Sequence, residues 1–294
     1  MDNKIGMSFT YWCQDWSGDF RYYARKIAGL GYDVMEMSLT NLDSLSRSGL
    51  DDVKKLGEDL GLGFSFTVGL TPDRDLTVED EAVRRRGIEY VKRLLETAHY
   101  MGGDVLGGLS YCAWPPVFPP YPFDRSAYMD RAASSLGEVV KTAEDLGMTL
   151  CFEVVNRFDA FLFTTVDESV EFCKRVGSPN LKMHLDTFHM NIEEDLIGAA
   201  ILRGAGHIGY FHVGETDRRP LDGKGRMDWD EFFSTLAKID YRGCIIQEPV
   251  IRSGGQVGYD MRMWRDQSHG ADEAQLDAMA KSSLDYIRAM CANY

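Results

Sequence analysis

Four ionisable side chains come at the ends of four consecutive apolar segments in the second half of the chain. Glu153 ends the segment MTLCFE, Asp186 ends LKMHLD, His212 ends HIGYFH and Glu248 ends GCIIQE. An ionised group at the end of a buried strand costs free energy unless it is paired or bound to a metal. A single carboxylate in such a position is usually a helix cap or an ion-pair partner, but four ionisable groups in succession favour a shared metal site.

The residue types indicate which metal this site would hold. Three carboxylates and one neutral imidazole are hard oxygen and nitrogen ligands, which suit Mn²⁺, Mg²⁺ or Co²⁺ better than zinc sites rich in thiolate. None of the six cysteines occupies a comparable position, although Cys151 lies close to Glu153 in the sequence. Four protein ligands leave about two octahedral positions open, and two neighbouring sugar oxygens would fill them.

The same residues suggest a reaction. A metal ion on a carbonyl oxygen acidifies the adjacent C–H bond and stabilises the enediolate that forms when the proton leaves. If Glu153 and Glu248 lie across from one another, one carboxylate can remove the proton and the other can return it to the opposite face. This reaction is epimerisation beside a carbonyl group.

Other polar and aromatic residues follow the same strands and the earlier ones. The polar ones are Asn156, Arg157, Asp159, His189, Glu215 and Arg218. We expect His189 and Arg218 to polarise or orient substrate oxygens, with a role in supporting the site or on the surface as the alternative. Trp16 and Trp114 follow the first and fourth predicted strands, where an aromatic face would pack on a sugar. Ordinary loop packing is the alternative for both tryptophans.

The elements that position these residues alternate between short apolar runs and longer segments of helical period. Strands are predicted to begin at Ile5, Asp33, Leu62, Asp104, Met148, Leu181, His207 and Gly243. Each interval has room for one helix and two loops, as a repeated βα unit requires. Residues 79–101 and the segment from Ala271 onward carry apolar residues at helical spacing. Gly31, Gly61 and Gly147 come just before predicted strands and are expected to end helices.

Eight βα units can form a closed barrel or an open doubly wound sheet. An open sheet that binds dinucleotides usually has a glycine-rich turn after its first strand, but here that strand leads into Thr10-Tyr11-Trp12. We therefore predict a single (β/α)₈ TIM barrel that spans residues 1–294 as one domain, because no linker or low-complexity run divides the chain. The proline cluster at residues 114–120 is expected to be a rigid loop at the barrel mouth, or else an uninvolved surface loop.

Composition narrows the class of protein. The formal net charge of −14 disfavours nucleic acid and anionic membranes as partners. The chain shows neither the apolar core of a signal peptide nor an apolar run of about 18 residues that would span a membrane. The six scattered cysteines contain no CxxC pair, so we expect reduced thiols and a cytoplasmic protein.

Across nearly its whole length the chain resembles the ketose 3-epimerases, the group that includes D-tagatose 3-epimerase and D-psicose 3-epimerase. The matching motifs are Tyr11-Trp12 with Trp16, EVVNRF (153–158), LDTFHMNIEED (185–195), FHVGETDRR (211–219), GKGRMDW (223–229), QEP (247–249) and Trp264-Arg265-Asp266. The resemblance implies a TIM barrel, an Mn²⁺ cofactor with Co²⁺ or Mg²⁺ as alternatives, and homodimers or homotetramers.

The resemblance also assigns roles. Glu153, Asp186, His212 and Glu248 are implied as the metal ligands, and Glu153 and Glu248 as the acid–base pair. His189 and Arg218 are implied as substrate contacts. The implied reaction interconverts C3 epimers of ketohexoses, such as D-fructose and D-psicose or D-tagatose and D-sorbose, by proton removal and return at C3 through a metal-bound cis-enediolate.

Two positions depart from the pattern of the family. Asp159 stands where many relatives have a glutamate, and Ser8 stands where relatives often have an aromatic residue. These departures keep related reactions open, namely a sugar isomerase or a lyase or dehydratase that acts on 3-oxo-glycosides or inososes. A nuclease on the same barrel would need more histidines than the six present and a basic groove. A non-catalytic sugar-binding barrel would be expected to lack one of the four ligands.

Overall fold

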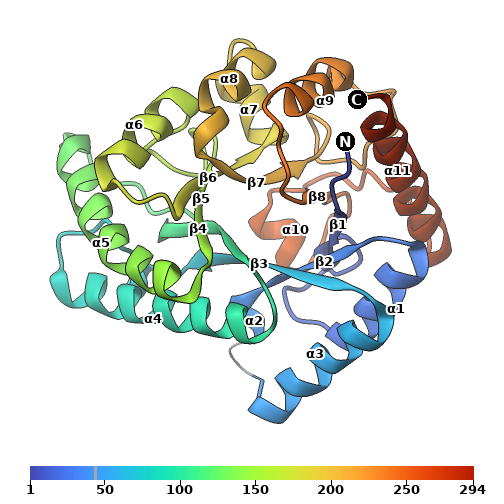
Figure 1. Ribbon diagram of the computed structural model, residues 1–294, viewed down its shortest axis with the longest axis horizontal. Coiled ribbons are helices and arrows are strands. Elements are labelled where there is room, and N and C mark those ends of the chain that lie inside the picture. Colours follow the sequence, from blue (N-terminus) through green and yellow to red (C-terminus); the bar gives the residue numbers. More distant parts are fainter. Residues whose placement is uncertain (43–44) are drawn as a thin grey trace. The chain divides into compact units, whose positions relative to one another are not determined.

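Eight parallel strands form a closed barrel in the order β1 to β8, as the sequence predicts (Figure 1). The computed structural model describes residues 1–42 and 45–294. The strands are β1 (Ile5–Ser8), β2 (Val34–Ser38), β3 (Gly63–Leu70), β4 (Val105–Ala113), β5 (Thr149–Val154), β6 (Leu181–Asp186), β7 (Ile208–Val213) and β8 (Ile245–Gln247). Each one begins within two residues of its predicted start.

Helices occupy the intervals between strands. They are α1 (Phe20–Leu30), α2 (Leu39–Leu42), α3 (Arg47–Leu60), α4 (Glu81–Tyr100), α5 (Arg125–Leu146), α6 (Val166–Val176), α7 (Thr187–Glu193), α8 (Ile197–Gly204), α9 (Trp229–Lys238), α10 (Gly255–Asp260) and α11 (Glu273–Asn293). The helices predicted over 79–101 and from Ala271 onward are confirmed as α4 and α11. The proline cluster lies between β4 and α5 outside any helix, as expected.

The predicted helix ends are also confirmed. Gly31, Gly61 and Gly147 are the C-caps of α1, α3 and α5, and all three have left-handed backbone angles, with φ of 94°, 65° and 67°. Glycine adopts this conformation without the steric penalty that a side chain brings. Each of these helices therefore ends just before the next strand begins.

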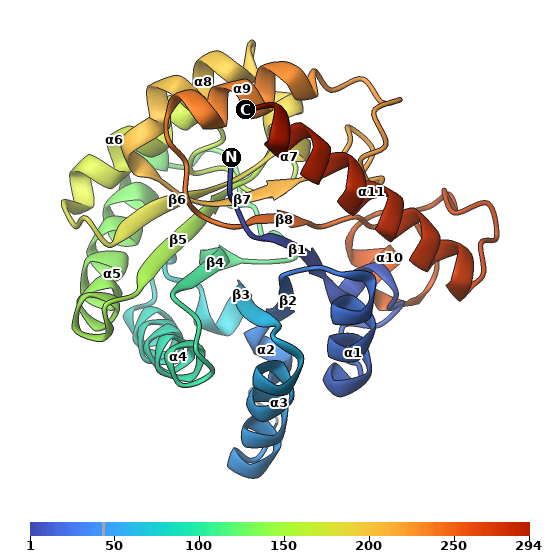
Figure 2. The same ribbon diagram turned by 45° about the vertical axis from the view of Figure 1, so that its right-hand side comes forward.

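The described residues divide into two compact units. The first contains residues 1–37, 45–64 and 211–294, and the second contains 38–42 and 65–210. Within the first unit α1 packs against α3 and α11, and α11 packs against α9 (Figure 2). Within the second unit the helices pack in succession, α4 on α5, α5 on α6 and α6 on α8.

Strand register brings side chains at the carboxyl ends together in pairs. On β1 and β2 Ser8 lies opposite Glu36, and on β5 and β6 Glu153 lies opposite His184. The carboxyl ends of barrel strands carry the active sites of this fold.

Among the described residues no helix has the length and apolarity needed to cross a membrane. The six cysteines are free thiols, as predicted.

Candidate functional site

In the second unit, the carboxyl ends of β5 and β6 bring Glu153, Asp186 and His189 together. One ligand-capable atom of each residue lies within 4.8 Å of the others. The Nε2 atom of His189 is 3.6 Å from Glu153 Oε1 and 4.0 Å from Asp186 Oδ2. Asp186 is the last residue of β6 and also the N-cap of α7, because its Oδ1 accepts a hydrogen bond from the Phe188 amide at 2.8 Å. Its Oδ2 atom is the one that faces the cluster.

Asn156 determines which nitrogen of His189 carries the proton. Its backbone amide donates to His189 Nδ1 at 3.1 Å, and its side-chain amide lies 2.8 Å from the same atom. A neutral imidazole that accepts at Nδ1 has its N–H at Nε2. In this tautomer His189 has no lone pair for a metal on the side of Glu153 and Asp186. It is instead a hydrogen-bond donor, which fits the predicted substrate contact.

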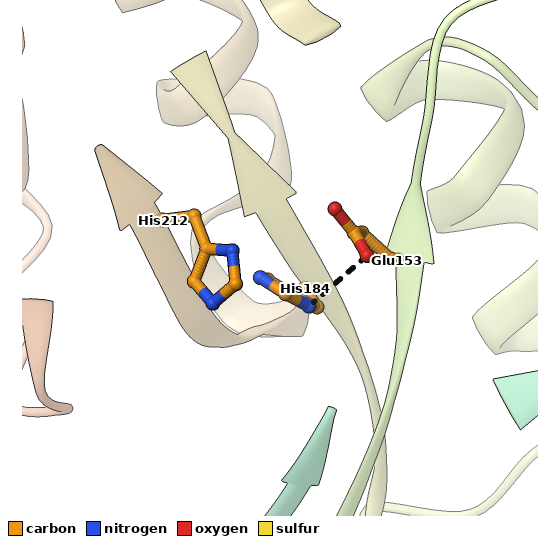
Figure 3. A group of neighbouring side chains, drawn as sticks. All are labelled: Glu153, His184 and His212. Carbon is orange, nitrogen blue, oxygen red and sulfur yellow. Dashed lines mark ion pairs between the residues drawn. The ribbon is translucent and has the colours of Figure 1, made fainter. Parts of the chain in front are cut away.

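His184 is a further residue of this cluster that the sequence reasoning did not select. It is fully buried on β6, and its Nδ1 atom accepts a hydrogen bond from the Gly108 amide at 3.1 Å. The same nitrogen lies 3.9 Å from Glu153 Oε2, so the ring backs the carboxylate from the neighbouring strand (Figure 3). The available signal was a histidine two positions before Asp186, between the apolar residues Met183 and Leu185.

In the first unit, His212 on β7 lies between two carboxylates. Its Nε2 atom is 2.6 Å from Glu36 Oε2, and its Nδ1 atom is 3.7 Å from Glu248 Oε2. His212 and Glu36 are both about 1 % exposed, whereas the side chain of Glu248 is 24 % exposed. Glu36 was missed at the sequence level, although the charged residue inside the apolar run DVMEMS marked it.

Electrostatics favour the charged form of the His212 ring. Burial opposes a positive imidazolium and lowers the pKa, but the carboxylates of Glu36 and Glu248 outweigh burial, and the pKa of His212 is raised well above its ordinary value. Any cation that binds through this imidazole must displace a proton that the two carboxylates hold in place.

Arg218 joins the same group of residues. It is 7 % exposed, and its Nη1 atom donates to Glu248 Oε2 at 3.0 Å. A guanidinium at this distance stabilises the ionised carboxylate and still has other N–H groups to offer a ligand. The structure thus places Arg218 beside Glu248, one of the predicted acid–base residues.

The other predicted substrate contacts have their own partners in the structure. Asp159 Oδ2 is 3.9 Å from His189 Nδ1. Trp16 packs against the apolar cluster that contains Val257, and its indole N–H donates to Asp260 at 2.7 Å. The backbone amide of Trp114 donates to a carbonyl of β3, which ties the start of the proline loop to the barrel. The roles of Asp159, Trp16 and Trp114 in sugar binding stay predictions.

Two more polar residues have clear partners. Arg157 points to Glu193, with its Nε and Nη2 atoms 2.9 and 3.0 Å from the two carboxylate oxygens. Ser8 is 4 % exposed, and its hydroxyl lies 2.9 Å from that of Thr10. Ser8 therefore belongs to a pair of hydroxyls at the carboxyl end of β1 rather than to an apolar wall.

The donor atoms fit a hard divalent cation. Glu153 and Asp186 Oδ2 are the carboxylate donors of the second unit, because the tautomer of His189 makes that imidazole a proton donor. In the first unit, Glu36 holds the Nε2 side of His212, so Nδ1 is the nitrogen directed toward Glu248. Carboxylate oxygens and one imidazole nitrogen match the preferences of Mn²⁺, Co²⁺ and Mg²⁺.

Comparison with known proteins gives one consistent group. Residues 24–288 match the family model described as xylose isomerase-like TIM barrel. The chain is 38 % identical over 287 residues to D-psicose 3-epimerase of Ruminiclostridium cellulolyticum, covering 97 % of both chains. It is 32 % identical over 283 residues to L-ribulose 3-epimerase of a Methylomonas species, covering 93 % of this chain and 94 % of the relative. The crystal structure of D-psicose 3-epimerase with D-tagatose from Clostridium cellulolyticum superposes with a TM-score of 0.95 at 36 % identity, covering 98 % of this chain and 99 % of the other.

Proposed function

The chain belongs to the xylose isomerase-like TIM barrel family and to the ketose 3-epimerases within it, and from this membership we infer that it is an isomerase of free ketohexoses. The expected substrate pairs are D-fructose with D-psicose and D-tagatose with D-sorbose. Relatives that act on D-psicose and on L-ribulose make a ketopentose the second substrate class to test. In all of these sugars the C3 hydrogen lies beside the C2 carbonyl, and removing it makes C3 planar.

The observation that carries this proposal is the pair of partly accessible carboxylates on β5 and just after β8. The side chains of Glu153 and Glu248 are 12 % and 24 % exposed, whereas Asp186 and Glu36 are almost completely buried. The two carboxylates come from different strands of the closed barrel, and we propose that they act on opposite faces of C3. Proton removal by one and proton return by the other would invert C3.

The neighbouring residues would hold the sugar for this exchange. His189 offers its Nε2–H beside Glu153, which suits a donor to a substrate oxygen on which negative charge develops. Arg218 donates a hydrogen bond to Glu248 and offers further donors at the same place. We propose Asp159, Trp16 and Trp114 as the outer contacts of the sugar, with the hydroxyl pair of Ser8 and Thr10 on the β1 side.

The proposed metal ligands are the four residues that end consecutive strands: Glu153, Asp186, His212 and Glu248. A divalent cation there, Mn²⁺ in the first instance, would supply positive charge that lowers the cost of removing the C3 proton. Glu153 lies close to Asp186 in one candidate group and His212 lies close to Glu248 in another, and these pairs and the orientation of His212 by Glu36 support the assignment. Co²⁺ and Mg²⁺ are the alternative ions.

Incubation of the enzyme with a panel of ketoses in D₂O tests the function directly. We expect deuterium at C3 of both epimers, because the carboxyl group that delivers hydrogen to C3 in either direction carries one that has exchanged with solvent. Mass spectrometry and proton NMR of the recovered sugars locate the label. Deuterium at C1 would favour an aldose–ketose isomerase, and loss of water would favour a dehydratase, so either result would refute C3 epimerisation.

Metal removal is expected to abolish turnover reversibly. EDTA-treated protein should lose activity and regain it with Mn²⁺ or Co²⁺. Affinity for Mn²⁺ should fall as the pH is lowered, because the raised pKa of His212 means that a proton occupies the metal-binding imidazole over a wider acid range. Titration calorimetry in two buffers with different ionisation enthalpies measures the affinity and the protons released at each pH.

The control for this experiment is EDTA-treated protein to which only buffer is added back. Full activity of that sample, confirmed metal-free by elemental analysis, would remove the metal from the proposal. An Mn²⁺ affinity that does not change with pH would exclude His212 as a ligand. The single domain over residues 1–294, the homodimer or homotetramer and the cytoplasmic location stay predictions.

A further inference from the structure

A buried carboxylate that the proposed chemistry does not use lies three residues after His212. Glu215 is 1 % exposed, and its Oε1 atom accepts a hydrogen bond from the indole N–H of Trp229 at 2.8 Å. The other oxygen, Oε2, is buried and has no hydrogen-bond partner within residues 1–42 and 45–294. Burying a carboxylate on one neutral donor is costly, and an apolar side chain would fill the same space at lower cost. A buried carboxylate of this cost calls for a specific role.

The loop before α9 is folded directly onto this carboxylate. A methyl group placed on Gly225 would lie only 1.7 Å from Glu215 Oε2 and 2.0 Å from its carboxyl carbon, so a side chain cannot fit there while Glu215 keeps its position. On the other side, Trp229 is the first residue of α9, is 3 % exposed and packs on Phe232. The Glu215 carboxylate is thus held between the backbone of Gly225 and the buried indole ring of Trp229, an arrangement that we call the clamp.

The backbone of Glu215 forms the turn that carries Arg218. The amide of Arg218 donates to the carbonyl of Glu215 at 2.9 Å, and the amide of Glu215 donates to the carbonyl of Arg219 at 3.1 Å. Within this turn Arg218 has a φ of 61°, a left-handed conformation that residues other than glycine rarely adopt. Such a conformation persists only where surrounding contacts impose it.

The same turn reaches the end of β8 at two points. The amide of Val250 donates to the carbonyl of Arg218 at 3.0 Å, and the guanidinium of Arg218 donates to Glu248 at 3.0 Å. The position of the guanidinium therefore depends on the backbone of the turn, and this turn begins at Glu215, whose side chain is held on both sides.

We propose that Glu215 is a positioning residue whose clamped carboxylate imposes the left-handed turn at Arg218 and so directs the guanidinium to Glu248 and the substrate. The inference rests on the proposed function, in which Arg218 contacts the sugar. Glu215 itself touches neither substrate nor metal in this scheme. Its carboxylate acts through the hydrogen bond from Trp229 and through close contact with Gly225.

The test compares conservative variants that break the clamp with one that keeps it. Trp229→Phe removes the indole donor, and Gly225→Ala pushes the carboxylate from the other side. Both are expected to lower kcat/KM for the best ketose by about 10-fold to 100-fold, mainly through KM, because Arg218 is displaced. Glu215→Gln keeps an oxygen acceptor for Trp229 and should retain most of the wild-type kcat/KM. Trp12→Phe is the matched control, since it removes an indole–carboxylate hydrogen bond to Asp277 elsewhere in the first unit.

Hydrogen exchange of backbone amides gives a readout that does not depend on activity. The amides of Glu215, Arg218 and Val250 make the hydrogen bonds of the turn. They should exchange faster than in the wild type in Trp229→Phe and Gly225→Ala. Their exchange rates should not change in Trp12→Phe and Glu215→Gln. Wild-type KM and wild-type exchange in both clamp variants would overturn the proposal. Loss of activity in Glu215→Gln with an unaffected Trp229→Phe would also overturn it, by giving Glu215 a direct chemical role. If the protein epimerises no ketose but the amides of the turn still exchange faster in both clamp variants, the proposed function is refuted and the structural role of Glu215 stands.

Discussion

Replacing Glu153 or Glu248 by glutamine is expected to lower kcat for C3 epimerisation by about 10²-fold to 10⁴-fold, the range that a positioned acid or base contributes. Glutamine keeps the size of the side chain and an oxygen that can contact a cation, but it can neither take nor return a proton. Both side chains are partly exposed at strand ends, so we expect the two variants to fold with a Tm close to that of the wild type. Initial rates with purified ketoses measure the loss.

The two variants should differ in a way that separates proton transfer from simple disruption of the site. If each carboxylate serves one face of C3, each variant still removes the proton from the one epimer whose hydrogen faces the remaining base. We therefore expect Glu153→Gln to exchange deuterium into one member of the epimer pair and Glu248→Gln to exchange it into the other, with little conversion in either case. Asp186→Asn, which alters a proposed ligand that is not an acid or base, should reduce exchange in both epimers. Exchange into the same epimer in both glutamine variants would contradict the two-base scheme.

The four proposed metal ligands could be selected from the sequence because their signal lies along the chain. Each proposed ligand lies within one residue of the end of its strand, and a closed barrel puts the carboxyl ends of its strands at one edge. For a single strand-end carboxylate, a helix cap was the alternative to a metal ligand. The structure shows that Asp186 can serve as both. Its Oδ1 atom caps α7, while Oδ2 faces the neighbouring cluster. A sequence pattern cannot separate the two oxygens of one carboxylate.

Polar residues inside apolar runs mark Glu36 and His184 in the sequence, but their roles could not be identified because these arise from pairings between distant strands. Glu36 and His212 are 176 positions apart in the chain, and Gly108 and His184 are 76 apart. The proton on His189 in α7 is likewise set by Asn156, which lies in the loop after β5. The length and spacing of each segment predict its secondary structure, whereas these contacts depend on barrel register, which apolar spacing does not encode.

The Glu36–His212 pair leads to the second large effect, on metal affinity. Histidines that bind metal through one nitrogen usually donate the other N–H to a carboxylate, which fixes the tautomer and makes the ligand more basic. Here the carboxylate is Glu36, at 2.6 Å from Nε2 and almost completely buried. Glu36→Gln keeps the hydrogen bond but removes the charge, and we expect affinity for Mn²⁺ to fall about 10-fold to 100-fold. Titration calorimetry of EDTA-treated protein measures this loss without any assay of turnover.

The control for this variant is Asp33→Asn, which alters a carboxylate just before the opposite end of the same strand, where it accepts a hydrogen bond from the Ile5 amide. That change is expected to leave Mn²⁺ affinity unchanged even if it lowers Tm. Nitrogen-15 NMR of the metal-free protein above the pKa of His212 adds a direct readout, since the wild type should hold the Nε2–H tautomer and Glu36→Gln should populate both tautomers. If Glu36→Gln binds Mn²⁺ as tightly as the wild type, the buried carboxylate does not tune the ligand. In that case the charge of Glu36 would raise the pKa of His212 in the metal-free protein but would not change the affinity of the site for Mn²⁺.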